Sequence, residues 1–441
     1  MQGPAIGRPS VRGRMSGAGA RDASAPGART WLLALLLFAM TDPIYPLLIR
    51  GWSEWVTDFS EVNRARKVAW AGIYLAAAVA TLLWREAAWR SLASHAWAPA
   101  ALVWFGASAL WAPDPTGSAL GFAQFALLLG FGAAAGGRLG PLGVVQAVAR
   151  AAWLALAAGL AMAVLSPQHA FGQHVNAGAF RGVYVEKNQF AMLLSFGVAA
   201  GAFEALARPG RARLWAGTAA LLVALVAARS SIALLQAGAV MALAAGRTGL
   251  AGARFGGAAL AAGALGAAAA LIAGLPAALS ALGEDLTLNG RTTLWAALWP
   301  DAAAASWIGR GFSGYWDDAA EARLLAELGW NARGAHSGWL TALLFGGAVG
   351  AALWLLLWLG VARRAAAALA PGAPAAPAGL AALAAVHLLW SLFETTQLMQ
   401  MNVHAAIAGL CLSLPSPERA PRRIAEARPG ARSRNSGLPI T

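Results

Sequence analysis

The chain has 441 residues, of which 59% are apolar and only 12% are charged. Soluble domains average roughly 25% charged residues, so this composition excludes an ordinary soluble fold. The net charge of +14 would suggest nucleic-acid binding in a soluble protein, but here the placement of the arginines indicates membrane topology, and no nucleic-acid partner is expected. The single cysteine excludes an intrachain disulfide and a cysteine-based metal site.

Apolar runs recur along the chain, and about 20 such residues in a helix cross a hydrocarbon core of ~30 Å. We predict an all-α integral membrane protein with about twelve transmembrane helices and a long periplasmic loop that contains short helices. The predicted helices span 31–49, 67–84, 95–112, 118–136, 143–165, 187–207, 213–228, 231–246, 253–275, 337–361, 379–397 and 400–414.

This prediction divides the chain into five parts. Residues 1–30 and 415–441 are expected to be disordered, basic cytoplasmic tails. Helices one to nine occupy 31–275, the periplasmic loop 276–335, and the last three helices 336–414.

The arginine-rich turns set the orientation. Segments 208–213, 247–254 and 363–364 all fall on the cytoplasmic side when both termini are cytoplasmic, as the positive-inside rule requires. Many tryptophans lie near predicted helix ends, where we interpret them as interfacial anchors in preference to sugar-stacking platforms. We find no paired broken helices of the kind that transporters use.

The outer segment 166–187 and its neighbours supply several candidate binding residues. Arg181, Lys187 and Asn188 precede or begin a predicted helix, and Arg229 ends another helix on the same side. Snorkelling of a lysine at the interface is the alternative explanation for Lys187. His169 and His174 lie in the same segment without supporting carboxylates, so a zinc site is not expected.

The long loop contains a predicted surface helix that starts near Asn289 or Thr292 and ends before Pro300. Arg291 lies at its N-terminus, where backbone N–H groups and the helix dipole favour an anion. Its guanidinium could grip a phosphate in a bidentate manner or contact lipid headgroups, and the spacing does not decide between the two.

A glycine-rich turn around Arg310 follows, and then a second predicted helix over 317–328. Capping is the favoured role of the acidic residues at the start of this helix. The loop closes with His336 at the mouth of a transmembrane helix, where a neutral imidazole could accept a proton near pH 7. A structural role for His336 is the alternative.

One further acid stands out near the C-terminus. Glu394 is predicted inside the membrane near Asn402 and His404. Acids at membrane depth are costly and by default mark a functional site.

Taken in order, several segments resemble the O-antigen ligase and polymerase family, including its exopolysaccharide-polymerase branch. The matching segments are Arg181-Gly-Val-Tyr-Val-Glu-Lys-Asn188, Ser230-Ser-Ile-Ala-Leu-Leu235, Gly290-Arg-Thr-Thr-Leu-Trp295, Gly309-Arg-Gly-Phe312, Ala335-His-Ser-Gly-Trp-Leu340 and Gly346-Gly-Ala-Val-Gly350. The resemblance covers roughly residues 100 to 414, and its most specific feature is a long loop bounded by Arg291 and His336.

The resemblance implies a metal-independent glycosyltransferase without a cofactor in the bacterial inner membrane. Such an enzyme moves a glycan from undecaprenyl diphosphate to an acceptor sugar on the periplasmic face. Carried over, Arg291 binds the diphosphate and His336 activates the acceptor hydroxyl. Arg181, Lys187 and Arg229 compete for the role of second phosphate-binding group. The substrate-binding candidates also include Asn188, Arg310 and Glu394.

Three classes of function stay open at this point. The first is a polymerase, which adds to another lipid-linked unit, or a ligase, which delivers to lipid A core; the segments around Lys187 and Glu394 slightly favour the polymerase. The second is a flippase for lipid-linked saccharides, which predicts binding residues at the membrane midplane. The third, a non-catalytic assembly protein, leaves Arg291 and His336 without a role.

Overall fold

The computed structural model describes residues 26–43, 60–173, 176–249, 290–305, 307–330, 332 and 334–416. Within these ranges every regular element is a helix, and an isolated antiparallel bridge joins Phe171 to Phe180. The prediction of an all-α fold is confirmed for this part of the chain. The predicted helix 253–275, the start of the long loop, His174 and nearly all of both tails lie outside the described residues.

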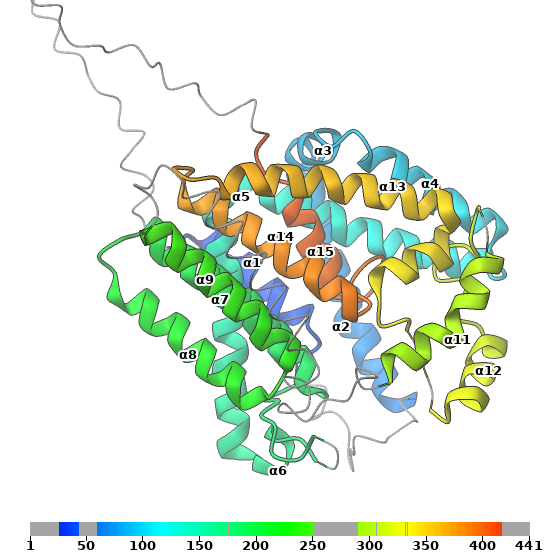
Figure 1. The fold of residues 1–441 in the computed structure, drawn as a ribbon, viewed down its shortest axis with the longest axis horizontal. Helices are drawn as coiled ribbons and strands as arrows, with labels where there is room; N and C mark the ends of the chain where they lie inside the picture. Colours follow the sequence, from blue (N-terminus) through cyan, green and yellow to red (C-terminus); the bar gives the residue numbers. More distant parts are fainter. Residues whose placement is uncertain are drawn as a thin grey trace, which may run out of the picture.

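Figure 1 shows how the helices pack into one bundle. In chain order they are α1 (Ala28–Ala39), α2 (Ser60–Leu83), α3 (Arg85–Ala93), α4 (Ala98–Ala107), a 3-10 turn (Ser108–Trp111), α5 (Pro115–Leu165), α6 (Pro167–Ala170), α7 (Lys187–Ala207), α8 (Ala212–Ala228), α9 (Ser231–Gly249), α11 (Arg291–Ala304), α12 (Asp318–Leu328), α13 (Gly338–Leu369), α14 (Ala375–Phe393) and α15 (Val403–Cys411).

Five of these helices are long and apolar enough to cross a membrane. Those stretches are Arg66–Leu83, Pro115–Leu165, Lys187–Ala207, Gly338–Leu369 and Ala375–Phe393. Large apolar side chains on their outer surfaces, such as Leu75 at 67% and Leu165 at 83% exposure, would meet water in a soluble protein. This arrangement is consistent with a membrane protein.

Close contact between small residues holds the centre of the bundle together. A Cβ atom built on Gly132 of α5 would lie 2.0 Å from the carbonyl oxygen of Ala406 in α15. One built on Gly409 of α15 would lie equally close to the carbonyl oxygen of Leu129. The backbones of α5 and α15 are therefore in direct contact, which small residues allow. Such close packing matters in a membrane, because the hydrophobic effect does not drive helices together in lipid.

Several boundaries differ from the predicted ones. The predicted helix 95–112 is α4 followed by a 3-10 turn, and α3, which was not predicted, lies before it. The predicted helix 379–397 ends at Phe393, because Glu394 takes an extended conformation (φ −140°, ψ 154°). By contrast, α7 has the predicted bounds.

The helix α13 is broken inside an apolar run, at Gly347 (φ 62°, ψ −165°). The break frees three carbonyls. The N–H groups of Arg310 and Gly311 donate to the carbonyls of Leu344 and Phe345 at 2.9 and 3.0 Å. The indole N–H of Trp104 donates to the third carbonyl, that of Gly346, at 2.8 Å. The long loop thus completes the hydrogen bonding of the broken helix.

Phe312 anchors the same part of the loop in the bundle. Its ring is fully buried and lies 5.5 to 6.5 Å, between ring centroids, from four other phenylalanines. These four are Phe105, Phe122, Phe125 and Phe345. The Gly309-Arg-Gly-Phe312 segment therefore docks the loop onto the bundle. Its glycines allow the loop backbone to approach the helices closely, and the side chain of Phe312 packs inside the bundle.

Substituting Gly347 with alanine is expected to destabilise the protein by about 3 kcal/mol, because its backbone angles suit only glycine. The added Cβ would also lie 2.4 Å from the backbone of Trp307. Gly72→Ala is the matched control, since Gly72 of α2 has open space around it and should change stability by less than about 1 kcal/mol. Thermal unfolding in detergent measures both, and equal midpoints for the two variants would contradict the docking.

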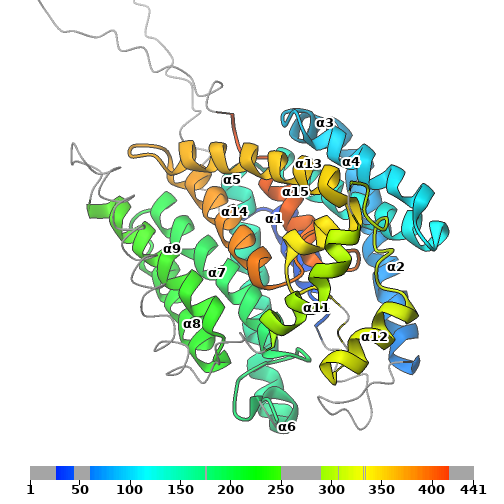
Figure 2. The same ribbon diagram turned by 45° about the vertical axis from the view of Figure 1, so that its right-hand side comes forward.

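Figure 2 shows the loop helices α11 and α12 next to each other. One correction concerns α11, which does not end before Pro300 but continues to Ala304. Burial of Leu294, Leu298 and Ala302 along one face explains why the helix tolerates the proline. The same helix packs on α13. The expected capping of α12 is confirmed, because Asp317 accepts from the N–H of Ala320 at 2.8 Å.

Candidate functional site

The long loop brings His336 to the N-terminus of α13. Its backbone takes a left-handed conformation (φ 44°), which is uncommon for a residue other than glycine. Two neighbouring contacts hold it there: the indole of Trp295 donates to the carbonyl of Ala335 at 2.9 Å, and Ser337 caps α13. Strain of this kind persists where the surroundings fix it, and it gathers at functional sites.

Glu394 joins His336 to Arg291. One carboxylate oxygen, Oε2, lies 2.8 Å from Nδ1 of His336, and the other accepts a hydrogen bond from the guanidinium of Arg291. The Nε atom of Arg291 donates to the carbonyl of Phe393 at 2.8 Å, which satisfies an end group of α14. Three residues from separate parts of the sequence therefore form one connected cluster, which we call the His336–Glu394–Arg291 cluster.

The charge on Glu394 is set by its two partners. Burial alone would raise the pKa of the carboxyl group, but the hydrogen bond and charge of His336, together with those of Arg291, outweigh it and hold the pKa below its ordinary value. Glu394 is therefore a carboxylate at neutral pH. It can accept the Nδ1 proton of His336, and it favours the tautomer in which Nε2 carries the lone pair.

The histidine ring faces open space on one side. Its side chain is 37% exposed, and within the described residues Nε2 has no hydrogen-bond partner. The ring of Trp330, itself 39% exposed, lies 6.4 Å from the His336 ring. An oriented imidazole beside an exposed aromatic face can take a proton from a bound hydroxyl group.

Arg291 and Arg310, two arginines of the loop, differ in accessibility. Arg291 has a side chain only 10% exposed, and its guanidinium is engaged by protein groups. Arg310 is exposed and lies beside the break in α13, next to the carbonyl of Leu344. Leu344 is eight residues after His336, and the part of α13 from Gly338 to Leu344 is about 9 Å long. Of these two, Arg310 is the arginine whose side chain can reach an incoming anion.

The other predicted binding residues form a second cluster. Lys187 donates to the carbonyl of Arg229 at 3.1 Å, and Asn188 accepts from the hydroxyl of Ser230 at 3.0 Å. Arg229, left-handed at the end of α8, donates to the carbonyl of Ala177 at 3.2 Å. This set joins the segment after α6 to the start of α7 and the α8–α9 turn.

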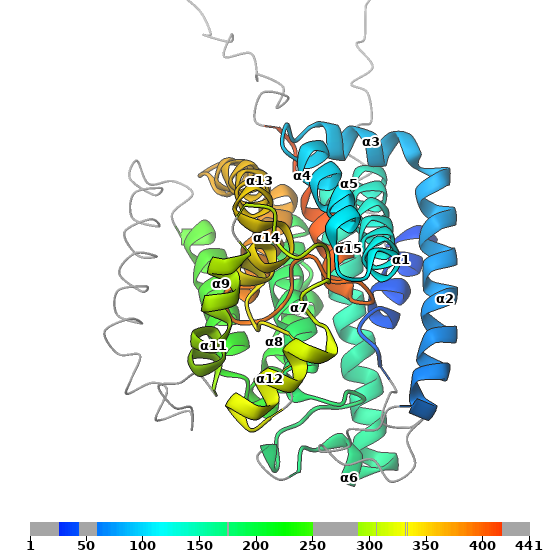
Figure 3. The same ribbon diagram turned by 90° about the vertical axis from the view of Figure 1, so that its right-hand side faces the viewer.

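Arg181 is buried and stabilises the segment between α6 and α7 through hydrogen bonds to backbone carbonyls. Its side chain is 1% exposed, and it donates to the carbonyls of His169 and Val185 at 3.1 and 3.2 Å. No contact between described residues brings Arg181, Lys187, Asn188 or Arg229 to His336. Figure 3 shows the segments of both clusters, near α6 and near α11 and α12, toward the end of the bundle opposite α3.

Glu394 was predicted near Asn402 and His404, but it contacts Arg291 and His336 instead. Asn402 caps α15 by accepting from the N–H of His404 at 3.0 Å. His404 lies against His387, with ring centroids 5.5 Å apart. Glu394 instead belongs to the non-helical stretch after α14, where it turns toward the loop. The prediction failed because the break at Phe393 has no proline or glycine signal.

Trp295 and Trp330 were missed as site residues. Trp295 lies within the predicted first loop helix, but nothing in the sequence pairs it with Ala335. Among the described residues, no group of three or more His, Cys, Asp or Glu side chains could hold a metal ion.

No model of a known protein family matches this chain, and no curated protein matches it either.

Proposed function

We propose that this protein is a membrane glycosyltransferase that moves a glycan from undecaprenyl diphosphate to an acceptor sugar, as an exopolysaccharide or O-antigen polymerase does. The observation that carries the proposal is the His336–Glu394–Arg291 cluster, because it joins an oriented imidazole to a guanidinium. The resemblance of the sequence segments to the O-antigen ligase and polymerase family supplies the substrate class.

In the proposed reaction, Nε2 of His336 takes the proton from an acceptor hydroxyl group. The hydroxyl oxygen forms a bond to the anomeric carbon of the donor sugar while the bond from that carbon to the diphosphate oxygen breaks. Undecaprenyl diphosphate leaves with the electron pair. Glu394 stabilises the imidazolium that forms, as a carboxylate beside a catalytic histidine does.

Positive charge is needed where the leaving group departs. Arg310 is the exposed candidate, and Arg291 lies deeper, where it fixes Glu394. The exposed face of Trp330 beside His336 offers an apolar surface for an acceptor sugar ring.

The proposal includes a topology. About twelve transmembrane helices cross the inner membrane, both ends of the chain are cytoplasmic, and the loop with Arg291 and His336 faces the periplasm. The supports are the distribution of arginine and the five long apolar helices.

Two alternatives make different predictions. A ligase uses the same donor and delivers the glycan to lipid A core. A flippase for lipid-linked saccharides is favoured by one observation, since the broken α13 is the kind of discontinuous helix that transporters use.

Purified protein in proteoliposomes, supplied with an undecaprenyl-diphosphate-linked saccharide, separates these functions. Release of undecaprenyl diphosphate with saccharides of two or more repeat units is the expected result. Release that requires added lipid A core would identify a ligase. Intact donor that only changes leaflet would identify a flippase, and an unchanged donor would overturn all three.

A further inference from the structure

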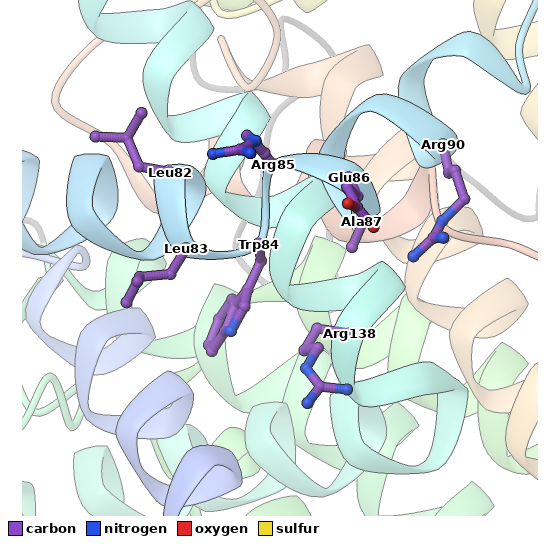
Figure 4. Close-up of a pocket in the computed structure, with 8 residues that line it drawn as sticks. All are labelled: Leu82, Leu83, Trp84, Arg85, Glu86, Ala87, Arg90 and Arg138. Atoms are coloured by element: carbon purple, nitrogen blue, oxygen red, sulfur yellow. The ribbon is translucent and has the colours of Figure 1, made fainter.

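A hollow of about 460 Å³ lies at the junction of α2, α3 and α5, away from the His336–Glu394–Arg291 cluster. Its volume falls in the range of small-molecule sites, roughly 300–1,000 Å³. Figure 4 shows its lining side chains: Leu82 and Leu83 end α2, Trp84 lies at the turn, Arg85 and Arg90 come from α3, and Arg138 comes from α5.

The position of α3 explains the hollow. Figure 3 shows α3 lying across the end of the bundle, while α2 runs along it. Because Trp84 stops α2 with a sharp turn, α3 begins at the next residue. The closeness of α3 to α5 depends on Gly137, where a Cβ atom would lie 2.8 Å from the hydroxyl of Ser91 and 3.0 Å from the carbonyl of Ala87. A helix that lies across the spans at one end has the orientation of an interfacial helix.

The contact between α3 and α5 at Gly137 explains the positive charge of the hollow. It sets Arg138, the residue after Gly137, beside α3, so three arginines line one space. Glu86 is the single carboxylate of the lining. Within the described part of the chain, none of the three arginines forms an ion pair, and all three side chains are exposed.

The rim of the hollow is apolar. Leu82 is 69% exposed and Leu83 is 74% exposed. Trp89 of α3, which is not part of the lining, is 66% exposed. Leucines that point away from the bundle suit acyl chains, and an exposed indole suits the headgroup level. A ligand that matches this lining has an anionic group for the arginines and a hydrocarbon part for the leucines.

We propose that the hollow lined by Arg85, Arg90 and Arg138 binds the phosphate headgroup of an anionic phospholipid, whose acyl chains lie against Leu82 and Leu83. Basic pockets between membrane helices bind such headgroups. The predicted topology places this end of the bundle in the cytoplasmic leaflet, so the lipid is distinct from the undecaprenyl-linked donor on the opposite face.

The test is native mass spectrometry of the delipidated, full-length protein in detergent, titrated separately with dioleoylphosphatidylglycerol, dioleoylphosphatidylcholine and inorganic phosphate. The test variant is the triple substitution R85A/R90A/R138A. The matched control, R29A/R213A/R363A, removes the same charge from three exposed arginines that the topology assigns to the same side.

We expect one phosphatidylglycerol to bind the wild-type protein and the control with equal affinity. The test variant should bind it on the order of a hundred-fold more weakly, since a basic residue near an anionic headgroup contributes roughly a five-fold factor. Equal weakening in the control would overturn the site, because only overall charge would then matter. Binding of phosphatidylcholine as tight as that of phosphatidylglycerol would also overturn it. If inorganic phosphate displaced the phosphatidylglycerol at equal concentration, the acyl chains would contribute nothing and the lipid proposal would fail.

Discussion

Replacing His336 with alanine is expected to reduce glycan transfer by about 10²–10⁴-fold, which is the usual contribution of a general base. In the native host, single lipid-linked repeat units should then accumulate, and mass spectrometry of the lipid-linked glycans measures them. Donor binding should persist, because the substitution leaves every arginine in place.

Two further variants make the result specific. His336→Asn keeps a side chain that tolerates the left-handed backbone, so a loss of activity in that variant cannot be assigned to strain. His169→Ala removes the histidine that contacts Ser166 in the segment after α5 and should leave transfer unchanged. Unchanged glycans in both His336 variants would refute the catalytic role, and long undelivered chains would identify a ligase.

Glu394→Gln is expected to lower transfer by a comparable factor while the size of the side chain is kept. The amide nitrogen of the glutamine would face Nδ1 of His336. Because this amide nitrogen is a donor, Nδ1 must then accept the hydrogen bond. The ring proton moves to Nε2, and the base is lost. The measurement is the rate of undecaprenyl diphosphate release at several acceptor concentrations, where kcat should fall much more than KM rises.

The same substitution has a stability signature. Glu394 has a pKa below its ordinary value of about 4.5, so its carboxylate stabilises the folded state above that pH and loses this contribution as the pH falls through the lower, folded-state value. At neutral pH, Glu394→Gln should cost about 3 kcal/mol, because it leaves Arg291 buried without its ion partner. The gap in thermal midpoint between the wild type and this variant should narrow below pH 4.5.

Glu327→Gln is the matched control for Glu394. Glu327 lies in the long loop and pairs with Arg323 at 3.0 Å on the surface of α12, where an ion pair contributes about 0–1 kcal/mol. A Glu394→Gln variant that behaved like Glu327→Gln in both rate and stability would show that the carboxylate neither orients His336 nor anchors Arg291.

The sequence predicts the elements of this fold better than their contacts. The bounds of α7 were predictable because an apolar run stands between Lys187 and the polar turn that starts at Arg208. The break at Gly347 was not predictable, because glycine is frequent in transmembrane helices. The break depends on contacts with the loop around Arg310, which the sequence of α13 does not show. What distinguishes Gly347 from Gly72 is a neighbour 2.4 Å from its absent Cβ atom.

The candidate site shows the same limit. Arg291 and His336 were recognisable as two polar residues at the ends of a loop. Glu394 is 103 residues from Arg291 and 58 residues from His336, and no local pattern joins them. The sequence therefore indicated the chemistry of the loop but not the carboxylate that connects it.

The broken helix α13 constrains the order in which the protein can assemble. Three of its carbonyls take their hydrogen bonds from Arg310, Gly311 and Trp104. In hydrocarbon each unsatisfied carbonyl costs several kcal/mol. All three donors precede α13 in the chain, so each has left the ribosome before the helix that needs it. The donors for these three carbonyls have therefore already been synthesised when the break in α13 enters the bilayer. In a circular permutation that placed α13 first, the three carbonyls would enter the bilayer without hydrogen-bond donors.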